Sequence, residues 1–91
     1  MNQFSTYPPC STFVYTGHIL RKIIARGIDE RDVERVAETG QLVRDYADDQ
    51  PFPSRLMLGL STNEQPLHVV IAQNDEKACF LITAYWPDPL I

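Results

Sequence analysis

The chain has 91 residues and a mass of 10.4 kDa, which suits one domain and leaves little room for a second hydrophobic core. Hydrophobic residues make up 44% and charged residues 22% of the sequence, a globular composition that excludes an intrinsically disordered chain. No run approaches the roughly 18 consecutive apolar residues of a membrane span, and Met1 to Ser11 lack the basic and apolar regions of a signal peptide. We therefore expect a cytoplasmic protein with no membrane partner.

The charges are unevenly distributed along the chain. Twelve acidic and 8 basic residues give a net charge of -4, which argues against sequence-independent binding to nucleic acid. Residues 1–28, however, contain Arg21, Lys22 and Arg26 and no acid. This local basic face is either a site for an anion or a surface that pairs with acidic groups of the protein itself or of a partner.

The two cysteines, Cys10 and Cys79, are far apart and have no CxxC spacing. Because no export signal is visible, we expect two reduced thiols, with Cys79 in the core and Cys10 exposed in a proline-rich arm. The cysteines and the two histidines, His18 and His68, lack the spacing of zinc ligands. We therefore predict no metal and no cofactor.

The N-terminal third predicts a flexible arm at residues 1–12, an extended piece at 13–15 and a helix at 17–26. The helix is amphipathic, because four apolar residues fall on one face: Ile19, Leu20, Ile23 and Ile24. Thr16 is placed to cap its start, and Gly27 to end it in the left-handed conformation.

A second helix is expected directly after the first. Asp29 is placed to cap it, and Asp32 approximates the glutamate of a capping box. One apolar stripe consists of Val33, Val36 and Ala37, and Gly40 is expected to end the helix as Gly27 ends the first. With almost no linker, the two helices must form a tight pair.

After Gly40 the period of the hydrophobic pattern changes from 3.6 to 2, which indicates strands. The expected strands are residues 41–46, 55–60, 67–72 and 79–86. On the last strand, simple alternation groups Phe80, Ile82, Ala84 and Trp86 on one face, opposite Cys79, Leu81, Thr83 and Tyr85. We predict a single α+β domain at residues 13–91, with two N-terminal helices packed on one face of an antiparallel sheet of about four strands.

Three blocks of residues resemble a known prokaryotic family. The first block contains His18, Arg26-Gly27-Ile28, Asp32-Val33 and Gly40. The second contains residues 49–55 (DQPFPSR) and Leu58-Gly59, and the third contains residues 66–70 (PLHVV), 82–85 (ITAY) and 87–89 (PDP). In this order, from about Tyr15 to Pro89, they resemble domain of unknown function family 4258.

The resemblance implies a fold and an activity. The family is grouped with metal-independent RNase toxins typified by barnase, EndoU, the colicin tRNases and RelE, which have N-terminal helices followed by an antiparallel sheet. It therefore implies an endoribonuclease, the toxin of a toxin–antitoxin pair. The family pattern has arginine four residues after the first-helix histidine, whereas this chain has Lys22, which keeps the charge but not the planar guanidinium.

Metal-free RNA cleavage needs a base, an acid and cations that stabilise the phosphorane. The candidate catalytic residues are His18, Arg26, His68 and Tyr85. The candidate substrate-binding residues are Arg21, Lys22, Arg55 and Thr83. Four of them have a stated structural alternative: His18 as part of a solvated helix face, His68 as a hydrogen-bonded strand residue, Tyr85 as a packed ring, and Arg55 as a partner of Asp48 or Asp49. Phe52 and Trp86 are candidates for stacking on bases, with loop anchoring or core packing as the alternative.

Two functional hypotheses follow. The first is a metal-independent endoribonuclease that acts on RNA, with His18 and Arg26 carrying most of the chemistry. The second is a non-enzymatic interaction domain that keeps the fold and binds an antitoxin, another protein or a second copy of itself through a free sheet face or edge. The sequence shows no complete catalytic set, and this leaves both hypotheses open.

Overall fold

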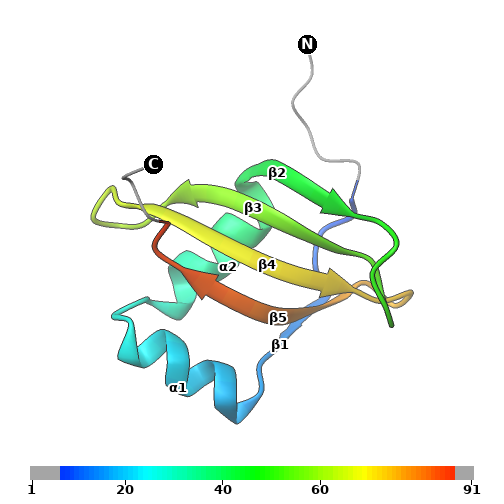
Figure 1. The fold of residues 1–91 in the computed structure, drawn as a ribbon, viewed down its shortest axis with the longest axis horizontal. Helices are drawn as coiled ribbons and strands as arrows, with labels where there is room; N and C mark the ends of the chain where they lie inside the picture. Colours follow the sequence, from blue (N-terminus) through cyan, green and yellow to red (C-terminus); the bar gives the residue numbers. More distant parts are fainter. Residues whose placement is uncertain (1–6, 88–91) are drawn as a thin grey trace.

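A computed structural model describes residues 7–87. Its elements, in chain order, are β1 (Thr12–Val14), α1 (Gly17–Ala25), α2 (Glu30–Thr39), β2 (Gln41–Tyr46), β3 (Ser54–Leu60), β4 (Pro66–Gln73) and β5 (Ala78–Tyr85). The two helices lie on one side of a twisted sheet (Figure 1). The predicted α+β class and helix pair are confirmed. The expectations for residues 1–6 and 88–91, which include the start of the arm and the last proline, lie outside the described residues.

Within residues 7–87 the sheet has five strands in the order β1-β5-β4-β3-β2. The pairs from β2 to β5 are antiparallel, as predicted, but β1 pairs parallel with β5 through Thr12 to Val14. The sheet is therefore mixed and has one more strand than expected. A three-residue strand has too few positions to give a recognisable hydrophobic pattern. Its pairing with β5 was also not predictable, because its partner is more than 60 residues away in the sequence.

Local capping explains the ends of both helices. The Thr16 hydroxyl accepts a hydrogen bond from the backbone N–H of Ile19 at 3.1 Å, and Gly27 follows α1 with a φ of 70°. The Asp29 carboxylate caps α2 by accepting from the N–H of Arg31 at 2.8 Å. The predicted capping box is wrong, because the Asp32 side chain turns away from the helix start and bonds to the turn after β3.

Gly40 ends α2 for a different reason from the predicted one. Its backbone is extended, with φ -73° and ψ 177°, and not left-handed. A Cβ atom at this position would lie 2.5 Å from the carbonyl oxygen of Val36 and 2.7 Å from that of Leu58. Glycine is therefore required by the close approach of two backbone segments, where α2 passes directly into β2 beside β3.

The core lies between the helices and one face of the sheet. α2 crosses β3 and β4, and α1 lies beside β5 (Figure 1). The buried apolar residues are Ile19, Ile23, Ile28, Val33, Val36, Ala37, Met57, Leu67, Val69, Ile71, Cys79, Leu81 and Ala84. The opposite, open face of the sheet has no element packed over it within residues 7–87 (Figure 1).

An irregularity in β5 reverses the predicted facing of its second half. The register with β4 shifts between Val70 and Ile71, so that Ile82 is an extra residue on β5. After this bulge Ala84 joins Cys79 and Leu81 on the core side, whereas Thr83 and Tyr85 move to the open face. The predicted alternation is therefore wrong from Thr83 onward, because a strict period of 2 does not allow for an inserted residue.

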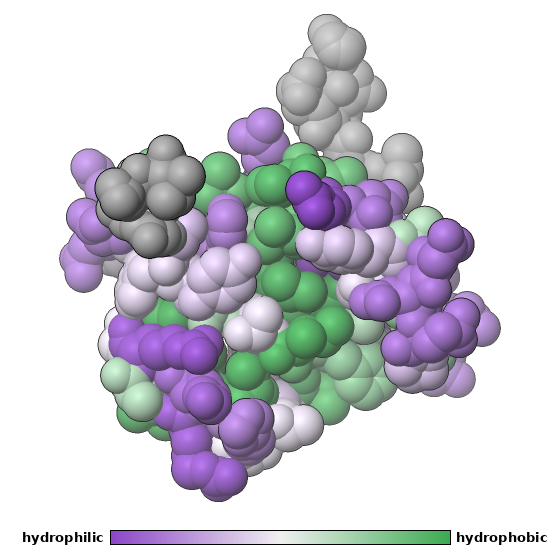
Figure 2. Space-filling model, in the orientation of Figure 1, coloured by the Kyte–Doolittle hydropathy of each residue, from purple (hydrophilic) through white to green (hydrophobic). Residues whose placement is uncertain are grey.

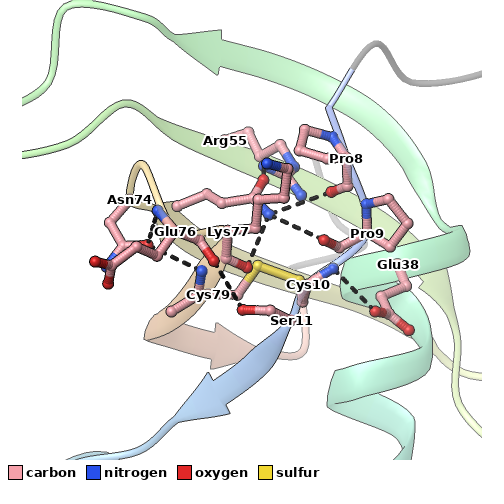
Figure 3. Close-up of a disulfide and its surroundings, with 12 residues drawn as sticks. Pro8, Pro9, Cys10, Ser11, Glu38, Arg55, Asn74, Glu76, Lys77 and Cys79 are labelled. Atoms are coloured by element: carbon pink, nitrogen blue, oxygen red, sulfur yellow. Dashed lines mark hydrogen bonds between the residues drawn. A yellow bond between two sulfur atoms is a disulfide. The ribbon is translucent and has the colours of Figure 1, made fainter.

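The two cysteines form a disulfide, so the prediction of reduced thiols is wrong. The Cα atoms of Cys10 and Cys79 are 5.5 Å apart, although the residues are separated by 69 positions in the sequence. The parallel pairing of β1 with β5 brings them together, since Cys10 lies two residues before the start of β1 and Cys79 lies in β5 (Figure 3). The arm is further attached where the N–H of Ser11 donates to the carbonyl of Lys77 at 2.7 Å.

Candidate functional site

The open face of the sheet carries the candidate site. Strand pairing arranges its residues in three rows across the strands: Gln41–Leu58–His68–Tyr85, Arg44–Leu56–Val70–Thr83 and Tyr46–Ser54–Ala72–Phe80. Two of the predicted catalytic residues, His68 and Tyr85, are direct neighbours in the first row. The predicted substrate-binding residue Thr83 lies in the next row on the same strand as Tyr85.

His68 and Tyr85 interact through both their polar atoms and their rings. The Nδ1 atom of His68 lies 3.3 Å from the hydroxyl oxygen of Tyr85. The ring centroids are 5.3 Å apart, and the planes are almost perpendicular, at 89°. Both side chains are half-buried, so they remain accessible from the open face. This pair combines an imidazole and a phenol, two groups that can exchange protons with a bound substrate.

A cation lies on the same face at the other edge of the sheet. Arg44 on β2 is exposed and heads the row that crosses Leu56 and Val70 to Thr83. Adjacent strands are about 4.8 Å apart, which places Arg44 and Thr83 on opposite sides of a face roughly 14 Å wide. Strict alternation along β2 would put Arg44 on the same face as Leu42, and the register shift between Leu42 and Arg44 puts it on the open face instead. The sequence pattern therefore predicts no function for Arg44.

Aromatic rings cover the other end of the open face. Phe52, from the loop between β2 and β3, stacks on Phe80 with centroids 5.9 Å apart and an interplanar angle of 17°. His68 and the third row, which contains Ala72 and Phe80, are four residues apart along β4, or roughly 13 Å at the usual rise of a strand. The face therefore presents a polar pair at one end and an aromatic stack at the other.

Apolar residues line the open face between these two ends and on either side of the His68–Tyr85 row. Leu56, Leu58 and Val70 are half-buried on the open face, and Leu60 and Ile82 are 56% and 47% exposed. Figure 2 shows a hydrophobic band across the middle of this face, bordered by hydrophilic residues. The site is thus a shallow, largely apolar surface with a few polar groups and not an enclosed pocket.

The predicted residues His18, Arg21 and Lys22 lie on α1 and not on the strands that carry this pair. His18, Arg21 and Lys22 are exposed on the helix, whose buried side is formed by Ile19 and Ile23. None of the three lines either of the two cavities described below. Neither of these two cavities therefore joins the cations of α1 to His68 and Tyr85, and the α1 side chains are accessible on the surface.

Arg26 connects the end of α1 to the last strand. Its Nη1 donates to the carbonyl of Ala84 at 2.8 Å, and its own carbonyl accepts from the indole N–H of Trp86 at 2.8 Å. β1 pairs with β5 only from Ala78 to Phe80, so the edge of β5 is unpaired at Ala84, the residue before Tyr85. Arg26 covers this part of the edge. These bonds account for Arg26 and Trp86 structurally, as anchors between α1 and β5.

Arg55 lies on the face of the sheet that the helices cover and not on the open face. It pairs with Ile71, which is in the core, and is only 3% exposed. Its Nη1 donates to the side-chain oxygen of Gln73 at 3.0 Å, and the ring of Tyr7 covers the guanidinium at 4.1 Å. It forms no ion pair with Asp48 or Asp49, and it is separated by the sheet from His68. Burial lowers the pKa of Arg55.

A polar cavity of about 410 Å³ lies where the α1–α2 junction meets the turn between β3 and β4. Asp32, which lines it, is 5% exposed. Its carboxylate accepts from the N–H and hydroxyl of Thr62 at 3.1 and 2.8 Å and pairs with Arg35 at 2.9 Å. Burial alone would raise the pKa of Asp32, but the bonds from Thr62 and Arg35 hold it below its usual value. Both carboxylate oxygens of Asp32 are used by Thr62 and Arg35, so Asp32 has a structural role and joins α2 to the turn after β3.

Two observations concern ligands and membranes. Among residues 7–87 no group of three or more His, Cys, Asp or Glu side chains is arranged to hold a metal ion. Within the same residues neither helix has the length and apolarity needed to cross a bilayer.

Comparison with known proteins identifies the family. The sequence pattern described as Domain of unknown function (DUF4258) matches residues 15–86, which cover most of the chain. The chain therefore belongs to this family, as the three blocks of residues indicated. No curated protein and no solved structure gives a significant match.

Proposed function

We propose that this member of the DUF4258 family is a metal-independent endoribonuclease, and that its reaction centre is the His68–Tyr85 pair on the open face of the sheet. The observation that carries the proposal is the 3.3 Å approach of the imidazole to the phenol on an accessible surface. The proposal keeps two of the four predicted catalytic residues. It moves the chemistry from the flank of α1 to the sheet.

The proposed reaction is attack of a ribose 2′-hydroxyl on the adjacent phosphate. One group of the pair accepts the proton from the 2′-oxygen, the P–O5′ bond breaks, and the other group gives a proton to the departing 5′-oxygen. The products are a 2′,3′-cyclic phosphate and a free 5′-hydroxyl, which balances the proton without a metal or water. Thr83 is placed one row away, where its hydroxyl can donate to a phosphate oxygen.

The rest of the face suits single-stranded RNA. Unstacked bases bind to aromatic side chains, and the Phe52–Phe80 stack lies roughly 13 Å along the strands from the His68–Tyr85 row, about two nucleotides away. Arg44 supplies a positive charge on the same face. The overall charge of -4 opposes loose binding to any polyanion, and so favours a substrate that makes specific contacts on this face.

The test is cleavage of a mixed RNA pool and of tRNA by the purified protein in the presence of a chelator. We expect products with cyclic phosphate ends. His68→Ala should lower the cleavage rate by about 100-fold or more, the typical contribution of an acid–base group. Tyr85→Phe should lower the rate by a smaller factor. Gln41→Ala is the matched control, because Gln41 belongs to the same row but carries no titratable group. Intact RNA with wild-type protein would refute the proposal.

His18→Ala distinguishes the two possible reaction centres. His18 is exposed on α1 and is not among the residues of the open-face rows. If the reaction centre is on the sheet, this variant should keep most of the activity. If it instead abolishes cleavage while His68→Ala does not, the α1 flank carries the chemistry, as the sequence analysis proposed, and our assignment to the sheet is wrong.

The apolar band favours a second candidate function, a protein-interaction domain without activity. An open face with half-buried Leu56, Leu58 and Val70 is typical of a surface that binds another protein, such as an antitoxin or a second copy. Substitution of Leu58 by Glu places a charge in the band. Under this alternative the protein would leave RNA intact, and Leu58→Glu would dissociate a complex seen by light scattering for the wild type. A monomeric wild type that cleaves RNA would exclude it.

A further inference from the structure

We propose that the cavity beneath the N-terminal arm, on the opposite side of the sheet from the His68–Tyr85 pair, is a binding site for a small organic monocarboxylate held by Arg55. The cavity has a volume of about 350 Å³, room for a small organic molecule. It lies between the arm, α2 and β3, and its lining residues are Tyr7, Pro8, Pro9, Ala37, Glu38, Arg55 and Met57.

Arg55 is the group that points to an anion. The residue is 3% exposed, and its charge has no carboxylate within ion-pair distance among residues 7–87. Nη1 is used by the neutral side chain of Gln73, whereas Nε is buried and has no hydrogen-bond partner in the same part of the chain. A buried, unsatisfied guanidinium N–H costs free energy unless a ligand accepts from it. A carboxylate is the planar acceptor that matches a guanidinium best.

The other charges around the cavity limit the ligand to one negative charge. Glu38 lines the cavity, and Asp45 pairs with Arg55 across the β2–β3 ladder and accepts a hydrogen bond from the hydroxyl of Tyr7. A dianion such as a phosphate monoester would face these two carboxylates with one cation to balance it. A monocarboxylate gains the contact with Arg55 at a smaller repulsive cost.

The walls of the cavity favour an apolar body on the ligand. Pro8, Pro9, Met57 and Ala37 supply hydrocarbon surface, and the ring of Tyr7 lies over the guanidinium. A flat aromatic or short branched carboxylic acid would bury its body against these residues, with its carboxylate toward Arg55. No Asn or Gln side chain is among these lining residues. Specificity would therefore come from the positive charge of Arg55 and from the shape of the cavity.

The disulfide assembles this site. Three of the lining residues belong to the arm, which Cys10–Cys79 joins to β5 directly beside the cavity (Figure 3). The side-chain nitrogen of Gln73 donates to the carbonyls of Pro8 and Pro9 at 3.2 and 3.3 Å, so the same amide that positions Arg55 also positions the arm. Glu38 accepts from the N–H of Cys10 at 3.1 Å. Release of the arm would remove one wall of the cavity.

The test is a titration of the oxidised protein with benzoate, followed by ¹H–¹⁵N NMR that includes the Nε–Hε signal of Arg55. We expect saturable shifts at that signal and at Ala37, Glu38 and Met57. Benzyl alcohol, which has the same ring without the charge, and phenylphosphonate at alkaline pH, which is a dianion, should each bind about tenfold more weakly or not at all. Equal binding of benzyl alcohol, tighter binding of the dianion, or no saturable shift at Arg55 would each overturn the proposal.

Two variants separate the site from a general effect of charge. Arg55→Gln should abolish the benzoate response, and Arg31→Gln should leave it unchanged, because Arg31 is an exposed arginine of α2 outside the cavity. If Arg55→Gln does not fold, the comparison of benzoate with benzyl alcohol on the wild type decides the matter. Shifts spread over the exposed arginines and retained in a folded Arg55→Gln protein would show non-specific anion binding and refute the site.

Discussion

The disulfide should contribute a large share of the stability of this domain. Replacement of Cys10 by Ser removes the bond without changing any other side chain of the arm. Cys10 is half-buried, so the substitution creates little cavity, whereas Cys79 is fully buried and its replacement would add the cost of a hole in the core. Cys10→Ser is therefore the cleaner perturbation.

The magnitude follows from the length of the chain that the bond closes. Cys10 and Cys79 are 69 residues apart, which encloses most of the protein in one loop. In the chain-entropy model a loop of this length stabilises the folded state by about 4 kcal/mol, through restriction of the unfolded chain. A domain of this size has a total stability of roughly 5–15 kcal/mol, so the loss should lower the melting temperature by roughly 20 °C.

The assay is urea unfolding followed by circular dichroism, for the oxidised wild type, the wild type in dithiothreitol and Cys10→Ser. We expect the last two to agree with each other and to differ from the first by about 4 kcal/mol. Ser11→Ala is the control for the other attachments of the arm. Its hydroxyl donates to the carbonyl of Glu76 at 3.0 Å on the surface, and its loss should cost about 1 kcal/mol or less.

Equal midpoints for the oxidised and reduced wild type would refute this reasoning. They would mean that the reduced unfolded chain is already restricted, or that the bond distorts the native sheet by as much as it stabilises it. A loss in Cys10→Ser without a loss on reduction would instead assign the effect to the substituted side chain. In either case the disulfide would not be the main constraint on the arm.

Two further perturbations test the local structure. Asp32→Asn should cost roughly 1–3 kcal/mol at neutral pH, because it weakens the bonds to Thr62. The folded-state pKa of Asp32 lies below its ordinary 3.8, so the wild type should lose this contribution as the pH falls through and below about 4, and the variant should show a flatter acid limb in pH-dependent unfolding. Gly40→Ala should destabilise more than Gly27→Ala in urea midpoints, since a Cβ at Gly40 collides with two carbonyls, whereas at Gly27 it meets nothing within 4 Å and costs only the left-handed backbone strain of about 1–2 kcal/mol. Equal costs would show that the chain relaxes around Gly40.

Parts of the candidate site could be predicted because they depend on local pattern. The strand that contains His68 and the strand that contains Tyr85 are both mainly apolar runs of strand length, and the short turn between them makes them neighbours. The direct pairing of the two residues was not predictable. The bulge at Ile82 moves Tyr85 from one face of the sheet to the other. The sequence pattern of the strand gives no sign of this inserted residue.

The environment of Arg55 could not be inferred from its neighbours in the sequence. Arg55 follows a loop with two acidic residues, which suggested a surface ion pair. In the structure it lies on the core side of β3 and bonds to Gln73 on the far side of a hairpin. Facing is decided by the register of the whole sheet, and a charged residue in an alternating strand can occupy either side when a partner satisfies it.

The amino-acid sequence by itself determined the two helices, their N-caps and four of the five strands, because each depends on contacts within a few residues. It also determined the family, which depends on the order of residue types along the chain. The tertiary structure alone decided the pairing of β1 with β5, the disulfide, the facing of Thr83 and Tyr85, and the burial of Arg55. The first two features join residues from opposite ends of the chain, and the last two depend on the register between strands. Their geometry is set when the sheet closes against the helices, and the free energy of that packing is not contained in any local segment.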